Sequence, residues 1–105
     1  LIEDYLQLFT DPVIVEGKSI SRETFRRQSG EYFMVNQTVK HYFENTRAFK
    51  SSEREYIVYT KQFYDFMNIE KNKFSSVVAH KKFTLIDISG ELMCKEVETL
   101  SRERK

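Results

Sequence analysis

The sequence has no tryptophan, one proline, one cysteine and three glycines among its 105 residues. Because a single thiol, Cys94, cannot form an internal disulfide, a disulfide-rich scaffold is excluded. No apolar run approaches the roughly 20 residues that a transmembrane helix needs. The sequence also contains no glycine-rich phosphate loop and no C-x-x-C pair, so a nucleotide-binding enzyme and a zinc-finger module are poorly supported. We expect Cys94 to be a small strand residue rather than a nucleophile.

The chain also lacks an excess of charge of one sign, with 17 basic residues, 16 acidic residues and a net charge of +1. Proteins that bind nucleic acids usually carry a basic excess on one face, so we expect no nucleic-acid partner. Local basic pairs occur at Arg26-Arg27 and Lys81-Lys82, but acidic residues accompany them, and we interpret both pairs as solvated surface. The two histidines lack the tight spacing of a metal site, and we expect no metal and no cofactor.

Large aromatic side chains are abundant, since nine phenylalanines and six tyrosines make up 14% of the chain. This composition favours long strands that carry large cross-strand pairs. A length of 105 residues is typical of one domain. Because the chain begins at Leu1 in a helical pattern without a capping residue, we expect a single domain over residues 1–105, excised from a longer protein with its first helix truncated.

The first third of the chain predicts two short helices. Ile2, Tyr5, Leu6 and Phe9 recur at helical spacing, and the proline at position 12 is expected to stop this helix. A short strand over residues 13–15 and a turn at residues 17–19 follow. Ser21 then fits the N-cap of a second helix, which we expect to end near residue 36.

The rest of the chain predicts four strands, over residues 39–50, 56–70, 74–88 and 92–100. Polar turns at residues 51–52 and 71–72 separate the first three strands, and Ser89-Gly90 is a clear hairpin signal before the fourth. The charged tail, residues 101–105, has no hydrophobic anchor, and we expect it to be frayed. This order of elements predicts an α+β domain.

The same order resembles the nuclear transport factor 2-like superfamily in its bacterial, SnoaL-like form. The stretch DPVIVEGKSISRETFRRQSGEYF resembles the part in which a short strand passes through a glycine turn into a helix that carries an aromatic pair, here Tyr32-Phe33. The segment DISGELMC resembles the closing hairpin, with Leu92 or Met93 where a tryptophan often lies. The resemblance implies a cystatin-like cone roll, in which helices pack in the concave face of a strongly curved antiparallel sheet. It also implies a frequent ligand pocket inside the cone and homodimerisation through the outer face of the sheet.

Pairing the strands across their predicted turns gives a candidate pocket. In that register Phe63 lies between His41 on one neighbouring strand and His80 on the other, while Tyr59 and Asp65 share its face. With two imidazoles, a carboxylate and a phenol around an aromatic ring, this group is the strongest candidate for a chemical site in the strands. The simpler interpretation is that both histidines are half-exposed surface residues and that Asp65 is a solvated side chain.

The opposite face of these strands carries Tyr42, Tyr64, Phe66 and Phe83. If that face is convex, the four side chains form an exposed aromatic patch and a candidate dimer surface. If it is concave, they pack against the helices. The alternation along the strands does not decide between the two arrangements.

Three functions stay open, because one fold can host many functions. The absence of catalytic motifs favours a non-catalytic interaction or small-ligand-binding domain, homodimeric and with a small hydrophobic ligand. The second is a small acid–base enzyme of the isomerase, dehydratase or cyclase type, with Asp65 as the base and Tyr59 or His80 as the proton donor inside the cone. The third is a component of an envelope or secretion assembly.

Overall fold

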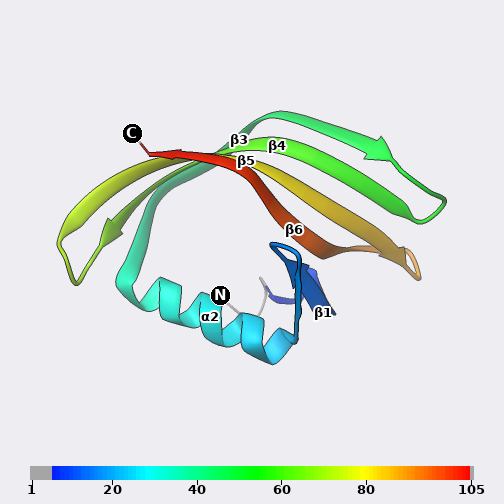
Figure 1. Ribbon diagram of the computed structural model, residues 1–105, viewed down its shortest axis with the longest axis horizontal. Helices are drawn as coiled ribbons and strands as arrows, with labels where there is room; N and C mark the ends of the chain where they lie inside the picture. The colour runs from blue at the N-terminus through cyan, green and yellow to red at the C-terminus, as the bar shows by residue number, and fades with distance from the viewer. Residues whose placement is uncertain (1–5, 105) are drawn as a thin grey trace.

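The computed structural model describes residues 6–104, which form a strongly curved sheet with a long helix across its concave side (Figure 1). The sheet has six strands in the order β2-β1-β6-β5-β4-β3. Neighbouring strands are antiparallel, except that β1 and β6 run parallel. This architecture confirms the predicted α+β class and curved sheet. The elements are β1 (Phe9–Val15), β2 (Lys18–Ile20), α2 (Arg22–Val35), β3 (Asn36–Lys50), β4 (Glu55–Asn68), β5 (Lys73–Ile88) and β6 (Glu91–Arg104).

Helix α2 begins where its sequence signal predicted. The Ser21 hydroxyl accepts a hydrogen bond from the backbone N–H of Thr24 at 3.1 Å, which satisfies one of the free donors of the first turn. Arg22 ties the start of the helix to β1, since its Nη2 donates to the Phe9 carbonyl at 2.8 Å and its backbone N–H donates to Asp11 Oδ1 at 3.0 Å. The helix is therefore anchored to the sheet at its N-terminal end.

A small core joins α2 and β1 to the sheet. Phe9, Val13 and Cys94 are its buried members, and the ring of Phe25 from α2 meets that of Phe9 edge-on, with centroids 4.9 Å apart. Burial of these side chains supplies the hydrophobic free energy that holds the layers together. The expectation that Cys94 is a small strand residue is confirmed. Half-buried apolar side chains surround the core: Val15, Ile20, Phe25, Phe83, Leu85 and Val97.

The first predicted helix ends earlier than the sequence suggested. Residues 1–5, which carry Ile2 and Tyr5, lie outside the described residues. Leu6 has helical backbone, but Phe9 already begins β1 and Pro12 lies inside that strand. The prediction of a helix through Phe9 was wrong, because the spacing that suggests a helical face instead reflects a strand residue that enters the core.

The charged tail is not frayed as far as residue 104. Strand β6 continues to Arg104, and its last residues pair with β5, with Arg102 opposite Ala79 and Arg104 opposite Val77. The prediction considered only the tail itself, which has no apolar anchor of its own. Its partners on β5 supply that anchor, since Ala79 is 0% and Val77 is 2% exposed.

The predicted strand registers also need correction. Phe63 lies opposite Tyr42 and Val78, and not between His41 and His80. A bulge near Asn45, whose φ is 53°, adds a residue to β3, and the turn between β4 and β5 is longer than the expected two residues. A shift by one residue moves a side chain to the other face of a sheet, whereas a shift by two does not.

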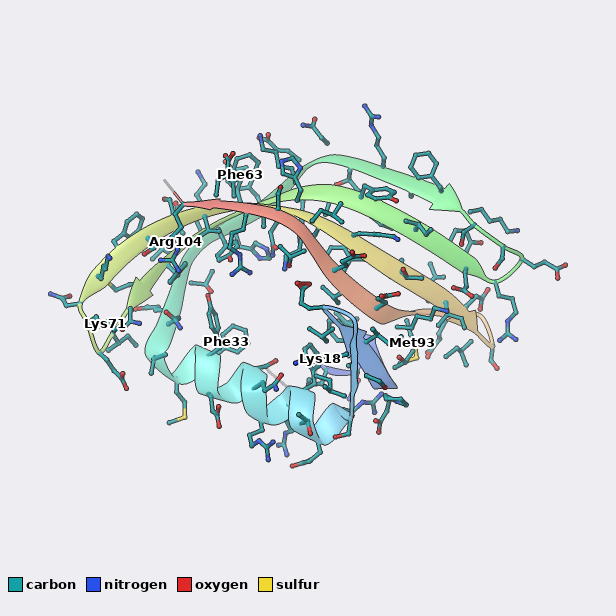
Figure 2. The ribbon with its side chains drawn as sticks, in the orientation of Figure 1. Lys18, Phe33, Phe63, Lys71, Met93 and Arg104 are labelled. Atoms are coloured by element: carbon teal, nitrogen blue, oxygen red, sulfur yellow. The ribbon has the colours of Figure 1, made fainter. Side chains whose placement is uncertain are left out.

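Contacts with α2 identify the two faces of the sheet. The ring of Tyr32 from α2 lies 6.3 Å from that of Phe66 on β4, so Phe66 is on the concave face. Because successive strand residues point to opposite faces, Phe63 is on the convex face, and Figure 2 shows it on the side of the sheet away from α2.

In the described part of the chain, no helix combines the length and the apolar character needed to cross a membrane.

Candidate functional site

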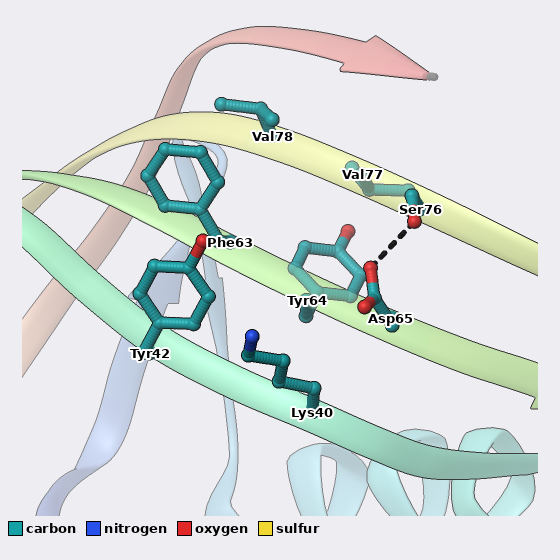
Figure 3. A pocket seen from close by; sticks show the side chains of 8 residues that line it. All are labelled: Lys40, Tyr42, Phe63, Tyr64, Asp65, Ser76, Val77 and Val78. Atoms are coloured by element: carbon teal, nitrogen blue, oxygen red, sulfur yellow. Dashed lines mark hydrogen bonds between the residues drawn. The ribbon is translucent and has the colours of Figure 1, made fainter.

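Four of the five predicted pocket residues lie on the convex face, in two separate hollows. Phe63 and Asp65 line a hollow of about 120 Å³ (Figure 3), and Tyr59 and His80 line another of about 270 Å³. Asp65 Oδ1 accepts a hydrogen bond from Ser76 Oγ at 2.5 Å. Because these groups face away from α2, they do not form an acid–base site inside the cone with Asp65 as the base.

The fifth residue, His41, lies on the concave face opposite Tyr64. Its Nε2 is 2.8 Å from Nε2 of Gln62, and its ring meets those of Phe43 and Tyr64 edge-on, with centroids 4.9 and 6.5 Å away. The one-residue shift in register therefore separates His41 from His80, and the expected pair of imidazoles around Phe63 does not form.

The residues predicted for a dimer surface are also divided between the faces. Tyr42 is convex, and its ring stacks on that of Phe63 with centroids 4.8 Å apart and planes 5° apart. Tyr64, Phe66 and Phe83 are concave, because they share the face of the sheet that α2 crosses. For Tyr64, Phe66 and Phe83, the structure therefore shows the concave arrangement, in which their face of the sheet is turned toward the helix.

A larger hollow lies on the concave face beside the β1–β2 turn. We call it the basic hollow, and its volume is about 580 Å³. Hydrogen bonds join its walls, since Lys81 Nζ donates to Thr99 Oγ1 at 2.7 Å and the backbone N–H of Thr99 donates to the Glu16 carboxylate at 2.5 Å. The backbone N–H of Glu16 in turn donates to the Val97 carbonyl at 3.0 Å. The lining residues are Val15, Glu16, Lys81, Val97, Thr99, Ser101 and Arg102.

Lys81 is the half-buried cation of the basic hollow. Burial lowers the pKa of Lys81, the neighbouring Arg102 lowers it further, and Glu16 acts in the opposite direction. A partly desolvated ammonium beside a second cation is less stable than one in water. An anion bound in the hollow would therefore stabilise the charged form of Lys81.

An aromatic wall made of Tyr32, Tyr64 and Phe66 lies on the same face. The rings of Tyr64 and Phe66 stack with centroids 5.7 Å apart, and Tyr32 reaches Phe66 from α2. Burial raises the pKa of Tyr32 and Tyr64 adds to this, while Arg102 and Arg104 lower it. The two guanidinium groups therefore act on the aromatic wall, and Figure 2 shows Arg104 on the side of the sheet that faces α2.

Among residues 6–104, no group of three or more His, Cys, Asp or Glu side chains is placed to hold a metal ion. The polar side chains of the basic hollow are two cations, two hydroxyls and one carboxylate. Cationic and hydroxyl donors suit an organic anion better than a metal ion, because metals bind electron-pair donors.

The sequence interpretation missed the basic hollow. A signal for Lys81 did exist, because the nearest β5 residues on its face, two on each side, are apolar: Val77, Ala79, Phe83 and Leu85. Reading Lys81-Lys82 as solvated surface overlooked this alternation. Arg102 gave no comparable signal, since it lies in the tail that was expected to be frayed.

No protein-family model matches this sequence, and no curated protein matches it. Several solved structures share its fold. A scytalone dehydratase-like protein from Novosphingobium aromaticivorans has a TM-score of 0.81 at 15% identity, over 97% of this chain and 72% of that one. A protein from Kribbella flavida has a TM-score of 0.79 at 9% identity, over 92% of this chain and 75% of that one.

A nuclear transport factor 2-like protein from Rhodospirillum rubrum, described as of unknown function in nutrient uptake, has a TM-score of 0.73. Its identity is 7%, over 93% of this chain and 82% of that one. At such identities a likeness shows the fold and does not transfer a function. The fold implied by the sequence resemblance is confirmed.

Proposed function

From the nuclear transport factor 2-like fold and the basic hollow, we propose that this protein is a non-catalytic domain that binds a small ligand on its concave face. The observation that supports this is the composition of the hollow. Val15 and Val97 give it apolar surface, while Lys81, Thr99 and Arg102 supply polar groups on the same lining. Its volume of about 580 Å³ falls within the range of about 300–1,000 Å³ that is common for small-molecule sites.

Filling the basic hollow should abolish ligand binding. The test is a titration of the protein with a panel of small aromatic and aliphatic fragments. Binding is monitored through changes in the backbone amide chemical shifts in NMR spectra. We expect the shifts of bound fragments to gather at Glu16, Lys81, Val97 and Thr99. In the variant Thr99→Phe the added ring occupies the hollow, and these shifts should disappear.

The matched control is Glu98→Phe, because Glu98 is next to Thr99 but pairs with Lys82 on the convex face. This variant should bind fragments as the wild type does. Fragment shifts that gather at Tyr59 or Asp65 instead, or that survive in Thr99→Phe, would contradict the proposed function.

We also propose that two copies associate through the convex face. This face exposes a row of aromatic side chains, with Tyr42 at 38%, Tyr59 at 38% and Phe49 at 54% exposure. The ring of Phe49 meets that of Tyr59 edge-on at 6.2 Å. Exposed aromatic surface of this kind is typical of protein–protein contacts, and a second copy offers the same surface in return.

A further inference from the structure

The basic hollow has an excess of positive charge. Lys81 and Arg102 line it, and Arg104 follows on the same face of β6. The carboxylate on its lining is that of Glu16, which already accepts a hydrogen bond from the backbone N–H of Thr99. Arg102 also lies close enough to lower the pKa of Lys81. A whole-chain charge of +1 therefore conceals a local concentration of cations.

Aromatic surface adjoins these cations. Arg102 and Arg104 act on the phenol of Tyr32, which belongs to the aromatic wall with Tyr64 and Phe66. Aromatic rings bind planar apolar groups by stacking or edge-on contact, and guanidinium groups bind carboxylates through paired N–H donors. The two kinds of recognition surface meet at Arg102.

We propose that the ligand of the basic hollow is a small aromatic carboxylate. Its carboxylate binds Lys81 and Arg102, with the hydroxyl of Thr99 beside them, and its ring lies toward the aromatic wall. The proposal rests on the proposed ligand-binding function and names the chemical class of the ligand. A neutral ligand of the same shape would leave Lys81 partly desolvated without adding a negative charge beside it.

The test compares 2-naphthoate with 2-naphthamide, which have the same ring system but differ in charge. Binding of each is measured by NMR titration to the wild type and to Lys81→Gln, Arg102→Gln and Lys82→Gln. Lys82 is the matched control, because it is adjacent to Lys81 but lies on the convex face opposite Glu98. Arg102 is exposed, so its substitution tests the site even if Lys81→Gln disturbs the fold.

We expect naphthoate to bind in the basic hollow at least about tenfold more tightly than naphthamide, since a charge-assisted hydrogen bond contributes roughly that factor. Lys81→Gln and Arg102→Gln should each weaken naphthoate binding by a similar factor and leave naphthamide unchanged, while Lys82→Gln changes neither. Equal affinity for the two probes, or equal weakening by Lys82→Gln, would overturn the carboxylate proposal and leave the ligand-binding function standing. If no probe or fragment shifts the amides of the hollow, both proposals are wrong.

Discussion

Burial controls the chemistry of Cys94. The side chain lies in the core with Phe9 and Val13 and is 7% exposed. Burial raises the pKa of Cys94 to about 11. Its thiol also donates a hydrogen bond to the Glu96 carbonyl at 3.3 Å. Because a thiolate is the reactive form, a raised pKa lowers the rate of alkylation at neutral and mildly basic pH.

The pKa of Cys94 gives a direct prediction. A rise from 9.0 to about 11 reduces the thiolate fraction at pH 8 roughly 100-fold. We expect iodoacetamide to modify the native protein at pH 8 at least about 100-fold more slowly than the protein unfolded in urea, as followed by mass spectrometry. Similar rates in the two states would show that Cys94 is accessible and ionised like a free thiol.

At the scale of single elements, the end of β6 forms part of the wall of the basic hollow. Arg102 and Arg104 face the concave side because residues 101–104 pair with β5. We predict that backbone amides in this stretch exchange with solvent more slowly than those of an unstructured peptide, at pH 6 and 25 °C in hydrogen-exchange NMR. Exchange at the unstructured rate throughout residues 101–104 would mean that the strand ends near Leu100.

Local signals predicted most of the elements. Ser21 predicts the start of α2 because its hydroxyl satisfies a helix N–H, and Ser89-Gly90 predicts a hairpin because both residues can adopt positive φ, here 54° and 89°. These signals depend on neighbours in the chain, so the sequence contains them in full. The resemblance to a cone-shaped fold added the curvature and the position of the helix.

The candidate site was much less predictable. The face of His41 depends on one extra residue at the Asn45 bulge, and no local signal marks that residue. Lys81 was recognisable from the apolar row around it, but Arg102 needed the knowledge that β6 continues into the charged tail. Its pairing is stabilised by buried β5 residues that are distant in the sequence, so it is a property of the tertiary structure.

At the scale of the whole molecule, the two faces of the sheet have separate roles in the proposals. Tyr42 and Phe43 are adjacent in β3 but lie on opposite faces, since Tyr42 pairs with Phe63 and Phe43 with Gln62. We predict that Tyr42→Glu weakens self-association of the wild type by at least about tenfold, because a carboxylate is costly to bury in an aromatic interface. Sedimentation equilibrium measures the change.

Phe43→Glu introduces the same charge one residue away, on the concave face, and should leave the association constant unchanged. A wild-type protein that stays monomeric at the highest concentration tested would refute the convex interface. Equal loss of association in both variants would place the contact elsewhere than on that face.

Strand β3 also forms an edge of the sheet, along Asn36–Lys50, and is exposed from residue 37 onward. A long edge strand with free backbone groups can be extended by a strand from another molecule, which leads to fibrous aggregation. The bulge at Asn45 interrupts that edge, and the charges of Lys40 and Arg47 flank it. Bulges and edge charges both hinder such pairing. The irregularity that shifts the register of β3 thus also makes this edge a poor template for a strand from another molecule.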